Sequence, residues 1–522
     1  MKIKEFRFNL ILFVVLAAEI LVSMYFTYRF GMNNIDADNS SEMVLAKLLA
    51  EERTFLSTNW FYSTELRVLN TQLVLSMLFR FCDNWQLVRT LGSGILMAVM
   101  VCSYLYMSSE AGLGRKGKAA ACFLVMPFCA CYQQFVLFGL YYIPHVSISF
   151  AAVALFIGVM KKGRLWQLKA AVSLLLAFAA GLGGIRMLVV LYCPLFLGSA
   201  AYAFFKYIRK KEINYTEITA AAAVTAAAGI GYIVNTAVMS NIYTFKSFNG
   251  TEFSNPNIFE RSDMIINGIL SFCGYSEGRR VIGAGLIANG LALGLFVYFV
   301  YIIIKMIREI DGYNRNERII ICFFTASFAV NMFTFYFADM WEQNGNYLIP
   351  FMIWMIPLFA VYFNHKDIKG RAVKCAMALV ACTFVINSAM VYHEWKNTDI
   401  NHGRQGIINY LTANGYKRGY ADFWDANVFT EMSGGQLSMC NLRALDESFS
   451  ALEWLMDKRY TEWDEDDAVF IIVDNAFSWQ NRDTLSYLNR DYMVAQNNEY
   501  CVFAFENDAQ LARIVEEGKH RE

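Results

Sequence analysis

Charged residues are scarce in this chain. Only 17% of its 522 residues are Asp, Glu, Lys or Arg, whereas 57% are hydrophobic and 16% are aromatic. With a mean hydropathy of +0.34, this composition excludes an ordinary soluble domain and predicts a polytopic membrane protein. The 45 basic and 45 acidic residues give a net charge of zero, so nothing attracts the chain to nucleic acid. We expect no nucleic-acid partner.

Familiar catalytic and metal-binding motifs are also missing. The sequence has no nucleophile elbow, Walker motif, Gly-rich phosphate loop, zinc-binding helix or Cys/His pair. Most of the twelve cysteines lie in apolar stretches without metal-ligand spacing, where they act as small apolar side chains. Only Cys440 and Cys501, in the polar C-terminal tail, are candidates for a disulfide. The chemistry that is left is acid–base transfer at a membrane.

Apolar stretches of span length predict about eleven transmembrane helices. They are Leu10–Tyr28, Leu87–Met107, Ala119–Leu137, Ile143–Met160, Leu168–Leu182, Met187–Phe205, Ile218–Met239, Val281–Ile304, Ile319–Phe337, Tyr347–Phe363 and Cys375–Tyr392. Alternate connections are basic, as the positive-inside rule requires of cytoplasmic loops: Arg115–Lys118, Lys161–Arg164, Lys206–Lys211, Lys305–Arg318 and Lys366–Lys374. We therefore expect an all-α membrane domain over residues 1–392 in the cell membrane, with a cytoplasmic N-terminus.

The composition changes after residue 392, where apolar runs shorten and charges become frequent. The pattern predicts a small α/β domain over residues 393–522 outside the membrane, because an odd number of spans follows a cytoplasmic N-terminus. Its expected elements are a helix over Gly403–Asn414, strands over Arg418–Phe423 and Ala468–Val473, a helix near Ser478–Asn489, and a terminal strand pair within Tyr492–Phe505.

Two long segments on the expected outer side do not cross the membrane. The first, Gly31–Gln86, contains apolar residues at helical spacing in Ser41–Phe55 and Leu66–Phe81. This spacing predicts helices that lie in the membrane interface, and a short extra pair of spans is the alternative. The second, Ser240–Arg280, is polar and unusually long for a membrane-protein loop, which indicates a function.

The acidic pair in Asp36-Ala37-Asp38 follows the first span within ten residues. Carboxylates are costly near hydrocarbon, so their presence there calls for a role such as activating a hydroxyl or binding a metal. The alternative is structural, because Asp is a good N-cap for the helix that is expected to start near Ser40. Both interpretations stay open at this point.

Further polar groups are expected at the same membrane face. Arginine pairs well with phosphate through its planar fork, and a substrate that bears both a hydroxyl and a phosphate would need acids and arginines together. The alternatives are headgroup anchoring for Arg279 and Arg280, and a simple helix-start role for His145. The candidate substrate-binding residues are His145, Arg186, Arg279, Arg280, Glu342 and Tyr347.

In these features the chain resembles the GT-C superfamily of integral-membrane glycosyltransferases, which includes protein O-mannosyltransferases and lipid A aminoarabinose transferases. The resemblance rests on the Asp36-Ala37-Asp38 motif, the interface helices, the many spans and the outer tail. Asn344–Pro350 is similar to an Arg-Tyr-Leu-x-Pro stretch of related bacterial proteins, with Asn346 where that pattern has Arg. Gly419–Val428 is similar to outer domains of uncharacterised members.

The resemblance implies a sugar donor linked to a polyprenyl phosphate and a glycan or lipid acceptor in a bacterial cell envelope. Asp36 is then the first choice for general base, and Asp38 is expected to orient the acceptor or a divalent metal. An arginine among Arg186, Arg279 and Arg280 would stabilise the departing phosphate. No other cofactor is expected, and family members differ in their metal dependence. The alternatives are a flippase or transporter for a lipid-linked saccharide, and a non-catalytic envelope protein.

Overall fold

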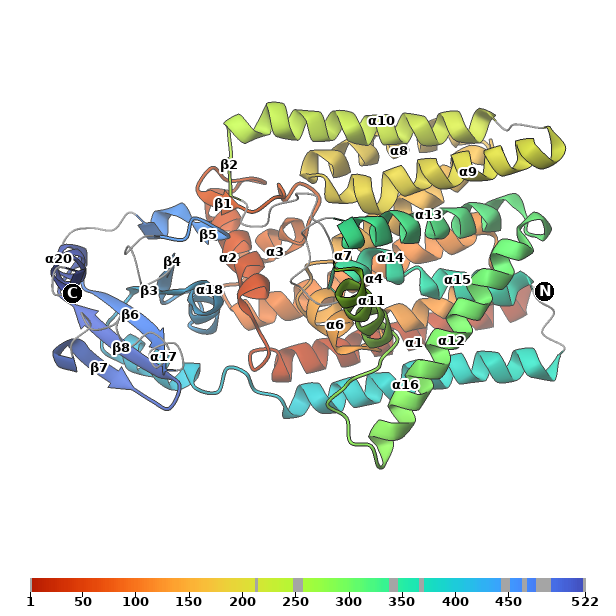
Figure 1. Cartoon of the computed structure of the whole chain (residues 1–522). Helices are drawn as coiled ribbons and strands as arrows, with labels where there is room; N and C mark the ends of the chain where they lie inside the picture. Colours follow the sequence, from red (N-terminus) through yellow and green to blue (C-terminus); the bar gives the residue numbers. More distant parts are fainter. Residues whose placement is uncertain are drawn as a thin grey trace.

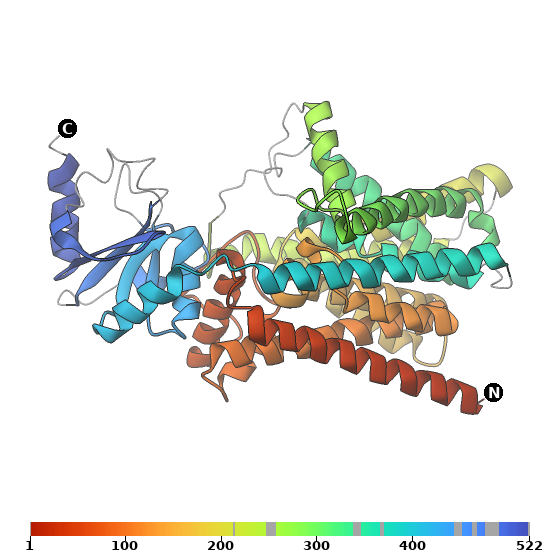
Figure 2. The same cartoon turned by 90° about the horizontal axis from the view of Figure 1, so that it is seen from below.

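The computed structural model describes residues 2–211, 215–246, 257–337, 346–365, 370–442, 451–461, 467–475 and 490–519. In this part of the chain, ten helices are long and apolar enough to cross a membrane, and most run side by side as a bundle (Figures 1 and 2). The chain is therefore a multi-pass membrane protein. The ten are α1 (Lys2–Phe30), α4 (Trp85–Ala111), α7 (Ile143–Met160), α8 (Trp166–Gly183), η3 with α9 (Leu188–Tyr192, Cys193–Lys210), α10 (Tyr215–Ala237), α12 (Ala284–Arg308), α13 (Arg315–Phe337), η6 with α14 and α15 (Asn346–Leu348, Ile349–Met352, Met355–His365) and α16 (Arg371–Asn397).

The span expected over Ala119–Leu137 is not one helix. It consists of α5 (Gly114–Ala119), η1 (Ala120–Leu124), α6 (Ala130–Tyr132) and η2 (Gln133–Phe138). Pro127 disfavours helical backbone at the residue before it, and Cys129 is extended with φ −149° and ψ 157°. This broken crossing nevertheless runs the length of the bundle, because Lys116 donates to Phe363 O at one end and Phe138 O accepts from Arg89 at the other.

The first long loop folds against the end of the bundle that faces the C-terminal tail, which we call the tail end (left in Figure 1). It forms α2 (Ala37–Glu52) and α3 (Gln72–Phe79), so the second predicted helix is confirmed only in its latter half. The residues before α3 are not helical. Other contacts fix them, since Asn70 Oδ1 accepts from Thr71 N at 2.7 Å and Arg67 pairs with Glu42 of α2 at 2.8 Å.

Three distant segments join at the tail end in a small sheet of order β2-β1-β5. The strands are β1 (Trp60–Tyr62), β2 (Thr244–Phe245) and β5 (Met456–Asp457). The helix α11 (Ile258–Phe272) lies between β2 and α12 in the sequence and packs against α13. The sheet therefore links the first loop, the second long loop and the tail.

The tail forms the predicted α/β fold. Its five-stranded sheet has the order β4-β3-β6-β8-β7, with β3 parallel to β4 and β6, and β8 antiparallel to β6 and β7. The expected helix near Ser478–Asn489 lies outside the described residues. The elements are α17 (Arg404–Ala413), β3 (Arg418–Asp422), α18 (Phe423–Met432), β4 (Ser438–Leu442), β6 (Val469–Asp474), β7 (Met493–Gln496), β8 (Tyr500–Phe505) and α20 (Asp508–Lys519).

Cys440 and Cys501 do not form the predicted disulfide, and the Cys501 thiol instead donates to Asn475 Oδ1 at 2.9 Å. Cys440 lies in β4 and Cys501 in β8, and two strands separate them in the sheet. Adjacent strands are about 4.8 Å apart, whereas a disulfide requires Cα atoms within about 7 Å. The predicted domain boundary at residues 392 and 393 falls inside α16 and stays a prediction.

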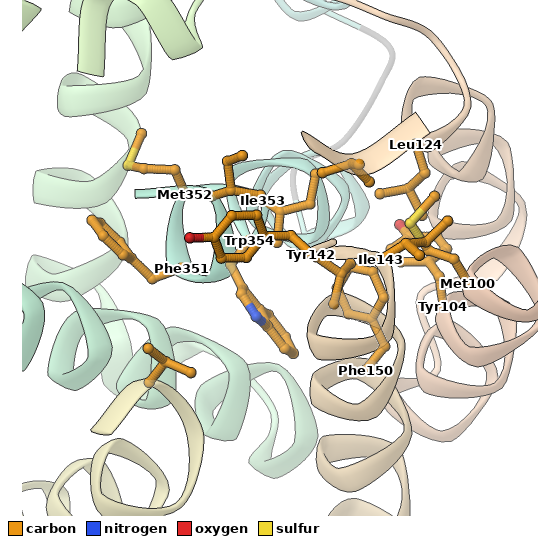
Figure 3. Packing of buried hydrophobic residues seen from close by; sticks show 14 of the residues in the cluster. Met100, Tyr104, Leu124, Tyr142, Ile143, Phe150, Phe351, Met352, Ile353 and Trp354 are labelled. Carbon is orange, nitrogen blue, oxygen red and sulfur yellow. The ribbon is translucent and has the colours of Figure 1, made fainter. Parts of the chain in front are cut away.

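Aromatic packing fixes the middle of the bundle (Figure 3). Tyr104 of α4 meets Phe150 of α7 edge to face at 5.3 Å between ring centroids, and Phe150 meets Trp354 in the same way at 5.1 Å. Trp354 Nε1 also donates to Ser149 Oγ at 3.0 Å. Such close packing holds α7 and the segment Asn346–His365 in a defined register.

Two helices approach each other closely enough to require glycine. A Cβ at Gly231 of α10 would lie 2.1 Å from Phe178 O of α8, and one at Gly181 would lie 1.9 Å from Ala228 O. We expect Gly231→Val to destabilise the protein by about 1–3 kcal/mol through overpacking, measured as thermal unfolding in detergent. Gly229→Val is the matched control, because a Cβ at Gly229 would meet nothing within 4 Å. Equal stabilities of the two variants would contradict the close approach.

Candidate active site

Asp36 is the N-cap of α2. Its backbone is extended, with φ −123° and ψ 176°, and its Oδ1 accepts from the amide of Asn39 at 2.8 Å. Its Oδ2 accepts from Gln134 Nε2 of the broken crossing at 2.7 Å. Burial is the largest cause that raises the pKa of Asp36, and these hydrogen bonds oppose the rise. The capping role is therefore present in the structure, and a role as base stays a prediction.

Asp38 lies in the first turn of α2 and differs from Asp36 in its surroundings. Its carboxylate takes part in no hydrogen bond or ion pair with another residue that the structure describes, and it is only partly buried. Burial raises its pKa to about 7, the charges of Asp36 and Glu42 add to the rise, and those of Arg67 and Arg186 oppose it. Asp38 is thus a carboxylate that changes its protonation near neutral pH.

A network of four charged side chains, which we call the carboxylate–arginine cluster, lies close to Asp38: the buried Glu42, Glu65 and Arg67 and the partly buried Arg186. Arg67 lies 2.8 Å from Glu42 Oε1 and 2.9 Å from Glu65 Oε2, and Arg186 Nε lies 2.6 Å from Glu65 Oε1. Burial disfavours the charge on Glu65, yet Arg186 above all holds its pKa below the usual value. Glu65 therefore stays ionised and orients both arginines.

Arg186 is placed by a glycine turn between α8 and α9. Gly184 has φ +141°, a conformation that side chains rarely adopt, and Gly183 O accepts from Leu66 N at 2.9 Å. The guanidinium carbon lies 5.5, 5.2 and 5.8 Å from the ring centres of Tyr141, Tyr142 and Tyr347. These rings hold the cation in place while Glu65 binds its Nε.

His145 joins the cluster from the first turn of α7. Its side chain is buried, and Nε2 lies 3.7 Å from Glu65 Oε2. Of the residues that the sequence singled out, His145, Arg186 and Tyr347 are therefore brought together at the tail end. Their common neighbour is Glu65, which the sequence did not single out.

A cavity of about 160 Å³ lies beside Arg186, and we call it the arginine cavity. Both polar side chains and the apolar Val189, Val190 and Phe335 line it. A guanidinium next to an apolar wall suits a ligand that combines an anionic group with a hydrocarbon chain. Its polar lining includes Glu65, Tyr142, Arg186, Asn331, Thr334 and Tyr347.

Two of the expected cations lie elsewhere. Arg279 lines a separate cavity of about 580 Å³ and is held by Glu394 at 3.0 Å and Gly274 O at 2.7 Å. Arg280 is exposed. Neither forms a hydrogen bond or ion pair with Asp36 or Asp38 in the described chain, and neither lines the arginine cavity. Glu342 lies outside the described residues.

Sequence reasoning missed Glu42, Glu65 and Arg67. The available signal was the charged pair in Glu65-Leu66-Arg67, since Arg67 interrupts the apolar stripe that was expected of a helix. A metal role for Asp38 also stays a prediction. Among the residues placed by the structure, no group of three or more His, Cys, Asp and Glu side chains is arranged to hold a metal ion.

Comparison with known proteins gives a match in structure alone. No protein-family model and no curated protein sequence matches the chain. Its structure is similar to that of ArnT from Cupriavidus metallidurans bound to undecaprenyl phosphate, with a TM-score of 0.55, 10% identity, and coverage of 94% of this chain and 97% of ArnT. The apo structure of ArnT gives 0.54, 11%, 94% and 97%. The predicted GT-C-like fold is confirmed.

Proposed function

We propose that this chain is a membrane glycosyltransferase that moves a sugar from a polyprenyl-phosphate donor to a glycan or lipid acceptor of a bacterial cell envelope. The observation that carries the proposal is the arginine cavity, where a fixed guanidinium adjoins apolar walls. Asp38 lies one turn before Glu42 on α2, and the ion pairs from Glu42 through Arg67 and Glu65 to Arg186 connect that helix to this cavity. A carboxylate, a cation and an apolar surface are what such a transfer needs.

In the proposed reaction, the acceptor oxygen attacks the anomeric carbon of the donor sugar while Asp38 takes the hydroxyl proton. The bond between the anomeric carbon and the phosphate oxygen breaks, and the phosphate leaves with the electron pair. Arg186 stabilises the negative charge that grows on this oxygen. Asp38 suits the base role better than Asp36, because both oxygens of Asp36 already accept hydrogen bonds.

The fold shared with ArnT supports the donor class, because the ArnT crystal structure contains undecaprenyl phosphate. The same orientation that the basic loops predict, with the N-terminus in the cytoplasm, would place Asp38 and Arg186 on the outer side. We also propose that residues 1–392 form the membrane domain and residues 393–522 form an α/β domain on the outer side. Arg279 and Arg280 have no part in it.

The test is turnover of a labelled donor by the purified full-length protein. We expect release of undecaprenyl phosphate from at least one undecaprenyl-phosphate sugar in a panel, together with transfer of the label to an added envelope glycan or lipid. In proteoliposomes, movement of the intact lipid-linked sugar between leaflets without cleavage would instead support a flippase. If the protein neither cleaves nor moves any of the donors, the proposal is refuted and the non-catalytic alternative is left.

A further inference from the structure

A buried ion pair joins the tail to the membrane bundle. Glu431 of α18 accepts two hydrogen bonds from Arg89 of α4, from Nε to Oε1 at 2.8 Å and from Nη2 to Oε2 at 2.7 Å. The Arg89 side chain is 2% exposed and that of Glu431 is 0% exposed. The geometry of this pair is the bidentate one, which gives a charge-assisted pair its strength and direction.

The same guanidinium holds two backbone carbonyls next to the acidic pair. Its Nη2 donates to Asn39 O at 2.9 Å, and its Nη1 donates to Phe138 O at 3.5 Å. The amide of Asn39 donates to Asp36 Oδ1, and Gln134, which lies in the broken crossing with Phe138, donates to Asp36 Oδ2. Arg89 therefore ties the first turn of α2 to the end of the broken crossing.

The tail also grips the residues that precede the acidic pair. Asn401 Nδ2 donates to the carbonyls of Met32 at 2.9 Å and Ile35 at 3.0 Å. Asn34 Nδ2 donates to Trp395 O at 3.2 Å. In addition, α18 packs directly against α2, as Figure 1 also shows. The start of α2 is thus held by the tail on both sides of Asp36 in the sequence.

We propose that Arg89 and Glu431 are positioning residues, through which the tail holds the first turn of α2, and with it Asp38, in place for sugar transfer. This inference rests on the proposed function. An apolar pair of similar volume would attach α18 to α4 at least as well, because a buried ion pair adds little net stability. Only a guanidinium reaches Glu431 and the two carbonyls at once, since it carries five donors in a rigid fork.

The test removes both charges together, in the double variant Arg89→Met with Glu431→Leu. This choice avoids leaving one buried charge unpaired, so the protein is expected to fold with a melting temperature close to that of the wild type. Arg89→Lys is the second variant, because a lysine keeps the charge beside Glu431 but lacks the fork that reaches Asn39.

Two measurements separate positioning from a merely structural role. Hydrogen–deuterium exchange of peptides covering residues 33–42 is expected to rise about tenfold in both variants, while β3 and β6 keep their protection. In the transfer assay, kcat is expected to fall about tenfold or more with an unchanged donor KM. The donor KM should stay unchanged because Arg186, which would bind the donor phosphate, lies on a separate segment, the glycine turn before α9.

The matched control is Arg315→Met with Glu217→Leu. Arg315 Nε lies 3.4 Å from Glu217, and its Nη1 donates to Met160 O at 3.2 Å. This pair should affect neither measurement. Unchanged exchange over residues 33–42 in the double variant would overturn the inference, as would an equal rise across β3 and β6. Exchange needs no substrate, so a wild type that transfers no sugar refutes the proposed function without altering the exchange result.

Discussion

Replacing Asp38 by Asn is expected to lower kcat for sugar transfer by about 10²–10⁴-fold, the usual contribution of a general base. Asn keeps the shape of the side chain but cannot take a proton from the acceptor hydroxyl. The donor KM should change little, because Arg186 and the cavity walls stay intact. The measurement is steady-state release of undecaprenyl phosphate by purified protein with a saturating acceptor.

Two other aspartate variants complete this experiment. Asp36→Asn should keep most of the activity, because Asn is as good an N-cap as Asp and can still accept from the Asn39 amide. Asp83→Asn is the surface control, since that carboxylate is 89% exposed and pairs with Lys47 at 2.8 Å. Loss of transfer in the Asp36 variant with full activity in the Asp38 variant would return the base role to Asp36.

The pH dependence follows from the same assignment. The base works when ionised, and the pKa of Asp38 is raised to about 7 by burial and then by Asp36 and Glu42. We therefore expect kcat to rise with pH up to about 7 and then to level off. Asp36→Asn removes one charge that raises this pKa, so the acidic limb should move to lower pH. If Asp38→Asn shows the same acidic limb of kcat against pH as the wild type, the assignment is contradicted.

Replacing Arg186 by Gln is expected to lower kcat by about 10²–10³-fold, because the phosphate then leaves without its cation. Binding of undecaprenyl phosphate, measured by calorimetry or thermal shift, should weaken at least about tenfold, since a charge-assisted contact is lost. The Glu65 carboxylate keeps Arg67 as its partner at 2.9 Å.

Two variants make the Arg186 result specific. Arg186→Gln with Glu65→Gln removes one charge of each sign, so it tests whether an unbalanced carboxylate causes the loss. Arg280→Gln is the matched control, because that arginine is exposed and lies outside the arginine cavity. Undecaprenyl phosphate that binds Arg186→Gln as well as the wild type would remove Arg186 from the phosphate site.

Much of the fold was predictable because its signals are local. Span length and hydropathy placed most of the membrane helices, and short, largely apolar runs between polar segments placed strands such as Arg418–Asp422 and Val469–Asp474. The broken crossing was the exception. Its apolar composition is that of a span, and the sequence does not reveal how far Pro127 disrupts the helix once neighbouring segments satisfy its backbone.

The site was predictable only in outline. The acidic motif and Arg186 stand out because charges are rare near hydrocarbon. How these groups are arranged in space cannot be predicted from the sequence, because the arrangement depends on contacts between distant segments. Gln134 occupies one oxygen of Asp36, and Glu65 orients Arg67 and Arg186. The separation of Arg279 into another cavity likewise follows from the path of α11 and α12, for which no local pattern exists.

By itself, the sequence determined the class of protein, the run of apolar helices, the change to an α/β tail and the presence of acids and arginines near one membrane face. These depend on the transfer of side chains between water and hydrocarbon, which composition and periodicity record directly. The tertiary structure alone decided which carboxylate is free, which arginine meets the cavity, and that Glu431 of the tail reaches Arg89. Hydrogen bonds and ion pairs act over a few ångströms, so only the folded chain brings such partners together.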